Sequence, residues 1–124
     1  MSYEFYKVMH LTGIFMVISA IGAHLLNGLL GGSKQFVGKK FVSILHGIGL
    51  LIVFVAGFGL MARIGLMGGS WPIWVILKMV VWLFLGVVIL IPRYKPTWTK
   101  AVWFAVIIAG SFAAFLAFYK PFLS

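Results

Sequence analysis

The sequence predicts an all-α integral membrane protein, a four-helix bundle whose helices run up-down-up-down across the bilayer. Of its 124 residues, 64% are hydrophobic and only 9% are charged, so the chain lacks the polar surface of a water-soluble domain. A hydrocarbon core about 30 Å thick needs roughly 20 apolar helical residues to cross it. Four such stretches with short connections account for nearly the whole chain, which predicts a single domain over residues 1–124.

The ends of the four helices are predicted where polar and turn-forming residues interrupt the apolar sequence. A loop rich in glycine and lysine follows the first span, and a Gly-Gly-Ser break follows the second. Pro72 falls in the first turn of the third span, where its missing N–H costs nothing, and Pro92 is expected to stop that span. The expected spans are 5–30, 41–67, 71–91 and 98–119.

The first span is expected to be a helix rather than a cleaved signal sequence. Its apolar run continues well past Ala20-Ile21-Gly22, the one passable cleavage site, and no proper basic segment precedes it. The first apolar stretch is therefore counted as a spanning helix.

The formal charge of +9 arises from ten lysines and arginines against a single acid, Glu4. In a soluble protein this balance would suggest a nucleic-acid partner. Here the cations fall at helix ends and in loops, where they fix topology and meet lipid headgroups, so we expect no nucleic-acid binding. The missing acids exclude catalysis by paired carboxylates, and the absence of cysteine excludes thiolate chemistry and covalent c-type haem.

The distribution of the cations predicts the orientation in the membrane. Six lie in the first and third loops and three lie at the termini or the second loop. The positive-inside rule then places those two loops in the cytoplasm and both termini outside it, in a bacterial inner membrane. The six are Lys34, Lys39, Lys40, Arg93, Lys95 and Lys100, and the three are Lys7, Arg63 and Lys120.

A few polar residues recur on faces rich in small residues. That spacing, alternating between three and four, is typical of the inward face of a left-handed bundle. The fourth span has no histidine or charge between its ends and is assigned to packing. The first face comprises His10, Gly13, Val17, Ala20, His24, Asn27 and Gly31; the second comprises His46, Gly49, Val53, Ala56, Leu60 and Arg63; the third comprises Trp74, Lys78 and Trp82.

These polar residues are predicted to lie at two depths, because antiparallel neighbours meet at equal distances from their connecting loop. His24 and His46 should be level near the cytoplasmic ends. His10 and Lys78 should share a depth in the outer half, with Arg63 about one turn further out. His10 and His24 are separated by about 21 Å along the helix axis, so two stacked sites fit one membrane thickness.

Two interpretations of these groups stand side by side. In the first, Lys78 extends to the near interface and the histidines bond backbone carbonyls across the bundle. In the second they bind haem, because imidazole ligates iron, cations pair with propionates and small residues admit the macrocycle. The candidate cofactor-binding residues are His10, Lys78, His24, His46 and Arg63, with His10, His24 and His46 as metal ligands and no catalytic residue assigned.

The distance between helices indicates which of the two levels has room for a porphyrin. Neighbouring helices pack about 8 to 10 Å apart, whereas diagonal helices of a four-helix square lie roughly 11 to 14 Å apart. The first and third spans are expected to be diagonal, so His10 and Lys78 are better placed to face each other across a porphyrin. His24 and His46 are left with three alternatives: a shared small metal, a second haem in an opened bundle, or a bond to each other.

The opening segment Tyr3-Glu4-Phe5-Tyr6-Lys7-Val8-Met9-His10-Leu11-Thr12-Gly13 resembles the first helix of HemJ-type membrane proteins, and Lys78 matches the lysine of their third helix. The resemblance implies a haem b cofactor, protoporphyrinogen oxidase-like activity and roles for that histidine and lysine. The segment from Ile44-Leu45-His46-Gly47 through Trp74 to Gly86 is also similar to small SirB-type membrane proteins.

The leading interpretation is therefore a membrane protein that binds haem b or another porphyrin, with electrons passed to a quinone or a membrane partner. Arg63 or Lys7 would contact a propionate. A second copy of the chain, in a homodimer, would complete the candidate site at His24 and His46. The alternative is a non-catalytic membrane subunit or scaffold with structural histidines. A small-solute transporter is disfavoured because the chain shows no inverted repeat or broken helix.

Overall fold

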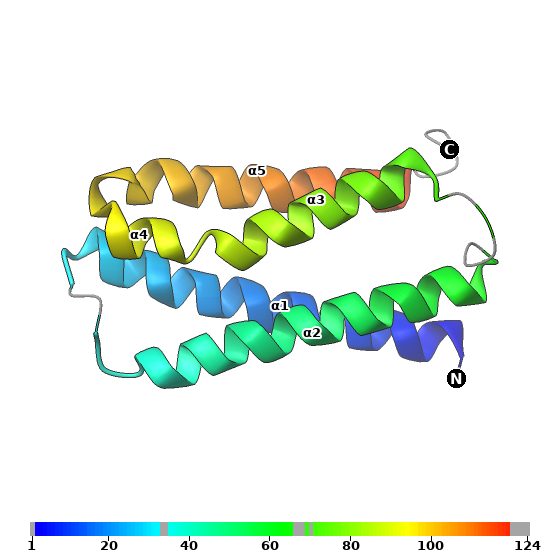
Figure 1. The fold of residues 1–124 in the computed structure, drawn as a ribbon, viewed down its shortest axis with the longest axis horizontal. Coiled ribbons are helices and arrows are strands. Elements are labelled where there is room, and N and C mark those ends of the chain that lie inside the picture. Colours follow the sequence, from blue (N-terminus) through cyan, green and yellow to red (C-terminus); the bar gives the residue numbers. More distant parts are fainter. Residues whose placement is uncertain (1, 33–34, 66–68, 70, 120–124) are drawn as a thin grey trace.

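The computed structural model describes residues 2–32, 35–65, 69 and 71–119, and every regular element in these residues is helical. Four segments are long and apolar enough to cross a membrane, so the predicted all-α membrane bundle is confirmed. The start of α1 and the end of α5 lie at the same end of the bundle (Figure 1). In chain order the elements are α1 Tyr3–Leu29, α2 Lys39–Arg63, α3 Ile73–Val87, α4 Leu90–Tyr94, the 3₁₀ turn η1 Pro96–Trp98 and α5 Thr99–Phe118.

The ends of the first two helices follow capping chemistry. Helix α1 begins at Tyr3 because the Ser2 hydroxyl accepts a hydrogen bond from the Phe5 N–H at 3.1 Å. Helix α2 ends at Arg63, earlier than expected, because Gly65 adopts the left-handed conformation that terminates helices. Residues 66–67 of the expected second span lie outside the described residues, as do Lys34 and Lys120.

The third span is interrupted, so the expectation of unbroken helices and the predicted role of Pro92 as a stop were both wrong. Helix α3 ends at Val87 and α4 continues the span from Leu90 to Tyr94, so Pro92 is inside a helix. A proline has no N–H to donate to the carbonyl four residues earlier, and its ring collides with that carbonyl. That carbonyl belongs to Val88, which is where the helix breaks. The proline therefore interrupts the helix one turn before its own position.

Helices α1 and α2 pack backbone to backbone through two glycines. A methyl group added to Gly13 would lie 2.9 Å from the Gly49 carbonyl oxygen and 2.8 Å from Val53. One added to Gly49 would lie 2.9 Å from Val17 and 3.0 Å from the Gly13 carbonyl oxygen. Small residues permit this close approach between membrane helices. The small-residue faces predicted for the first two spans therefore do face each other.

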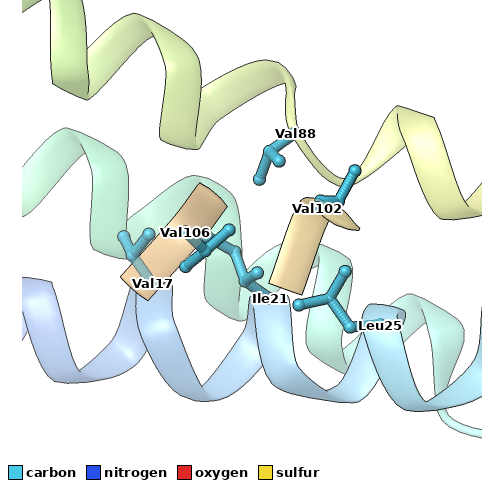
Figure 2. Close-up of a cluster of buried hydrophobic side chains, with 6 residues drawn as sticks. All are labelled: Val17, Ile21, Leu25, Val88, Val102 and Val106. Carbon is cyan, nitrogen blue, oxygen red and sulfur yellow. The ribbon is translucent and has the colours of Figure 1, made fainter. Parts of the chain in front are cut away.

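The core beside this helix pair joins α1, α5 and the break in the third span. Figure 2 shows Val17, Ile21 and Leu25 of α1 directed toward Val88, which lies where α3 gives way to α4. Val102 and Val106 of α5 complete the cluster. Val88 has no exposed surface. The interruption of the third helix is thus buried in the bundle.

The outer surface of the bundle is apolar. Large hydrophobic side chains point away from the core on every long helix, including Phe15 at 70% exposure and Ile108 at 68%. Such a surface is stable only in a lipid environment, since soluble proteins rarely expose large contiguous apolar areas. Its surface and its four spans define an integral membrane protein in contact with the bilayer.

Candidate functional site between the helices

His10 lies half-buried on the inward face of α1, against α2. Its Nδ1 is 3.1 Å from the carbonyl oxygen of Val53. Because a carbonyl can only accept, the ring nitrogen at this distance carries the proton and donates it. The Nε2 atom of His10 is therefore the nitrogen with the lone pair. Metal-ligating histidines are usually oriented in this way, with one ring N–H bonded to a backbone carbonyl and the other nitrogen available to the metal.

Lys78 lies on α3 within electrostatic range of His10. The register of α2 against α3 agrees with this placement, because Trp82 of α3 donates to the Leu50 carbonyl of α2 at 3.0 Å. Lys78 is one turn further toward the outer end of α3 than Trp82. This placement agrees with the predicted shared depth of His10 and Lys78.

Aromatic side chains separate α2 from α3 at this depth, which the sequence interpretation did not include. The centre of the Phe54 ring lies 5.0 Å from that of Trp82 and 4.7 Å from that of Phe58, and the ring centres of Phe58 and Trp71 are 5.5 Å apart. Phe54 and Phe58 are one helical turn apart, which places both on the same face of α2. The four-residue spacing of Phe54 and Phe58 in the sequence could have indicated this aromatic face. These rings hold α3 away from α2, in contrast to the glycine contact between α1 and α2.

His24 and His46 are both buried, at 3% and 4% exposure, but they are not level. The glycine contact sets the register of α1 against α2, with Tyr6 beside Gly59 and Gly13 beside Gly49. This register places His24 level with the first turn of α2 and His46 one to two turns deeper, roughly 6 to 12 Å along the axis. The two residues are thus offset along the axis because helix packing, rather than the centre of the loop, determines the pairing. They nevertheless lie within electrostatic range of each other, which agrees with the prediction that they are close together.

His46 bonds the interrupted helix. Its Nε2 lies 2.9 Å from the carbonyl oxygen of Leu85 and therefore donates to it. In a continuous helix that carbonyl would accept from the N–H of Ile89, but in the described residues the α-helical bonds stop at Val88. An unpaired carbonyl is costly inside a membrane. His46 thus satisfies a backbone group exposed by the break, which is the structural interpretation for this residue.

This role predicts a coupling between His46 and Pro92. His46→Leu should destabilise the protein by about 1 kcal/mol, the usual scale of a hydrogen bond between membrane helices. In a Pro92→Ala background the N–H of Ile89 can return to the Leu85 carbonyl, so the same substitution should cost clearly less. Unfolding in mixed detergent micelles, measured on both single variants and the double variant, gives the coupling energy. Fully additive effects would contradict the role.

His24 lies in a cationic setting. Its Nε2 is buried and makes no hydrogen bond within the described part of the chain, and its ring meets Phe36 edge-on at 5.5 Å. Arg93, His46 and Lys39 all lie within electrostatic range of it. The imidazole is therefore surrounded by positive or neutral groups. This arrangement suits an anion nearby better than a metal cation.

The remaining candidates lie further out. Arg63 is exposed at the last residue of α2, one turn beyond Gly59, which contacts Tyr6. Arg63 is therefore about two turns outside the level of His10 rather than the predicted one. Lys7 is exposed, with its Nζ 5.8 Å from the centre of the Tyr3 ring. Both cations belong to the outer end of the bundle.

No cluster of three metal-binding side chains is present in residues 2–32, 35–65, 69 and 71–119. Comparison of the chain with family models, curated proteins and solved structures finds no match. The fold and the polar residues therefore define the class: an integral membrane four-helix bundle with a half-buried histidine near a lysine in one half and two buried histidines in the other half.

The donor chemistry at the outer level fits haem. A b-type haem needs an axial nitrogen lone pair, and the His10 tautomer set by Val53 provides one. Lys78 brings a positive charge near His10, and a positive charge is the kind of group that pairs with a propionate. The imidazole packs beside Gly57 of α2, where an added methyl group would lie 3.5 Å from the ring, in ordinary van der Waals contact. His46 donates its Nε2 proton to Leu85, so its Nδ1 is the nitrogen that keeps a lone pair.

Proposed function

We propose that the protein binds haem b or a related iron porphyrin inside the membrane and serves a redox role through it. The observation that supports this most is the hydrogen bond from His10 Nδ1 to the Val53 carbonyl, which fixes the tautomer of an axial ligand. His10 would be the axial ligand and Lys78 the electrostatic or distal partner. Arg63 and Lys7 are the cations available to a propionate at the outer end.

Bound haem would supply one-electron chemistry at its iron. The protein's own residues would orient the axial imidazole through Val53 and exclude water with the Phe54, Phe58 and Trp82 rings. A protoporphyrinogen oxidase-like activity, with electrons leaving to a quinone and with a homodimer as the assembly, extends the same proposal. It rests on the resemblance of the first and third helices to HemJ-type proteins.

Titration of the purified protein with haemin in detergent tests the proposal. We expect a saturable Soret band, shifted from that of free haemin, at one haemin per chain. Micelles of the same detergent without protein provide the blank. A spectrum that never departs from that of micellar haemin would reject haem binding.

A second candidate function is that of a non-catalytic membrane subunit or scaffold. The bonds from His46 to Leu85 and from His10 to Val53 favour it, because each histidine bonds a backbone carbonyl of a neighbouring helix, as expected of structural histidines. The glycine contact of α1 with α2 also needs no ligand. In this case the same haemin titration gives no shifted band, and the protein remains folded throughout.

We also propose that both termini lie outside the cytoplasm. The first and third loops hold the cation excess of the sequence, and cytoplasmic loops are enriched in lysine and arginine. The start of α1 and the end of α5 lie at the same end of the bundle, so they share one side of the membrane in either orientation (Figure 1). Alkaline phosphatase fused after Ser124 should be active, whereas green fluorescent protein at the same point should be dark. The opposite pattern would reverse the orientation.

A further inference from the structure

Two residues, Val88 and Ile89, link α3 to α4, and the chain is not helical between the two (Figure 1). Within the described residues the N–H of Ile89 makes no backbone hydrogen bond, and the N–H of Ile91 reaches only three residues back, to the Val88 carbonyl at 3.2 Å. A rotation of the backbone here therefore disturbs fewer α-helical bonds than a rotation inside a continuous helix. Hinges in proteins are short segments of this kind at the ends of regular elements.

Helix α4 is anchored in a tightly packed end of the bundle. A methyl group added to Gly28 of α1 would lie 2.6 Å from Cβ of Pro92 and 2.8 Å from the Thr99 hydroxyl oxygen. Thr99 is 1% exposed, and its hydroxyl donates to the Pro96 carbonyl at 2.7 Å. Such close contacts leave little room for repacking. The end of α1, α4 and the start of α5 therefore form one unit on which α3 can pivot.

Helix α3 meets α2 through side chains rather than through close backbone contact. The Trp82 indole donates to the Leu50 carbonyl at 3.0 Å. Further from the link, Trp74 and Val75 of α3 pack in one cluster with Met61 of α2. Side chains of this kind can adopt new rotamers and repack, whereas the glycine contact between α1 and α2 is made by backbone atoms. The contact between α2 and α3 is therefore the one that can open.

The aromatic side chains between α2 and α3 are in contact with one another. Their neighbouring ring centres are 4.7 to 5.5 Å apart, the usual spacing of packed aromatic pairs. A planar ligand inserted here needs a further separation of about one van der Waals contact, roughly 3.5 to 4 Å. Lys78 is ten residues from Val88, about 15 Å along the helix axis, so a rotation of about 15° at the link supplies that separation. The aromatic side chains are Phe54, Phe58, Trp71 and Trp82.

We propose that α3 is a gate that swings about Val88 and Ile89, with the hydrogen bond from Trp82 to Leu50 as its latch. The same rotation moves Trp82, six residues from Val88, by about 2 Å, which breaks a hydrogen bond of 3.0 Å. Leu85 is close to the link and moves by only about 1 Å, so His46 stays beside it. The gate deepens the proposed function and rests on it, because haem is what the opened space would admit. The swing itself belongs to the haem-free chain.

Pairs of spin labels in the full chain, without haem, test the swing. The sequence has no cysteine, so an introduced pair is the only site of labelling. Val55 of α2 and Ile76 of α3 are exposed and report the gate, whereas Leu11 of α1 with Val55 reports the glycine-packed hairpin. Double electron–electron resonance should give a distance distribution about twice as wide for Val55→Cys/Ile76→Cys as for Leu11→Cys/Val55→Cys. Equal widths would overturn the hinge.

Two substitutions test the hinge and the latch separately. Pro92→Ala restores an N–H that can bond the Val88 carbonyl and continue the helix through the link, so the distances across the gate should narrow to the width of the control pair. Trp82→Phe keeps an aromatic ring but removes the N–H, so these distances should shift to longer values. An unchanged control pair shows that each variant is folded. Without the narrowing the hinge is wrong, and without the lengthening the latch is wrong.

Haemin added to the labelled protein tests what the gate admits. We expect the distance across the gate to increase by about 4 to 5 Å, the displacement of Ile76 for a rotation of about 15°, while the control pair is unchanged. If the Soret band shows bound haemin and the distance across the gate stays the same, the gate is wrong although haem binding stands. If haemin does not bind, the haem proposal and the role of the gate fail together, and the haem-free measurements still decide the swing.

Discussion

Gly13→Ala and Gly49→Ala are each expected to destabilise the protein by about 1 to 3 kcal/mol, the usual cost of overpacking a core. The added methyl group would lie within 3.0 Å of a carbonyl oxygen on the facing helix in both cases. A backbone atom cannot move aside as a flexible side chain can, so α1 and α2 would have to separate. The separation would also weaken the bond from His10 to Val53, which crosses the same pair.

Glycines in the same two helices provide matched controls. A methyl group on Gly22 of α1 or Gly47 of α2 would meet nothing within 4 Å. Gly22→Ala and Gly47→Ala should therefore be neutral or stabilising, because alanine favours helix over glycine. Unfolding of all four variants in mixed detergent micelles decides the matter. If the buried and open positions respond alike, the close packing of α1 on α2 is not what holds the hairpin together.

His10→Ala is expected to weaken haem binding at least a hundredfold, because it removes the axial bond on which the proposal rests. Thr12→Ala is the control, since Thr12 is exposed and its hydroxyl bonds only the Val8 carbonyl of its own helix at 2.9 Å. Haemin titrations at equal concentrations of folded protein compare the two. A Soret band retained in full by His10→Ala would exclude His10 as the ligand.

Lys78→Met should have a smaller effect in the same titration. The methionine keeps the length and apolar stem of the side chain but removes the charge that lies within range of His10. We expect roughly tenfold weaker haemin binding with the axial spectrum preserved, because loss of a propionate contact does not remove the iron ligand. A changed spectrum would instead indicate that Lys78 ligates the iron.

Much of the fold could be predicted because the apolar composition of a membrane helix, and the spacing of its small and polar residues, depend on what each face of the helix contacts. The four spans, the inward faces of Gly13 and Gly49, and the shared depth of His10 and Lys78 all followed from apolar length and the three-and-four spacing. These features depend on local sequence and on simple antiparallel geometry.

The features that could not be predicted depend on contacts between distant residues. The register of α1 against α2 is set by the glycine contact, so His24 and His46 are displaced from the level that the loop suggested. Pro92 breaks the helix at Val88 rather than ending it, and only the folded arrangement places His46 beside the carbonyl that the break exposes. The structural role of that histidine was left open by the sequence for this reason.

Rescue of His10→Gly by free imidazole tests the central claim most directly. If His10 supplies the axial nitrogen, this variant should bind haemin weakly, and added imidazole should enter the space left by the side chain and restore the shifted Soret band of the wild-type protein. Imidazole should not change the wild-type spectrum at the same concentration. A variant whose haemin spectrum equals that of the wild-type protein without imidazole, or a wild-type protein that binds no haemin, would contradict the account.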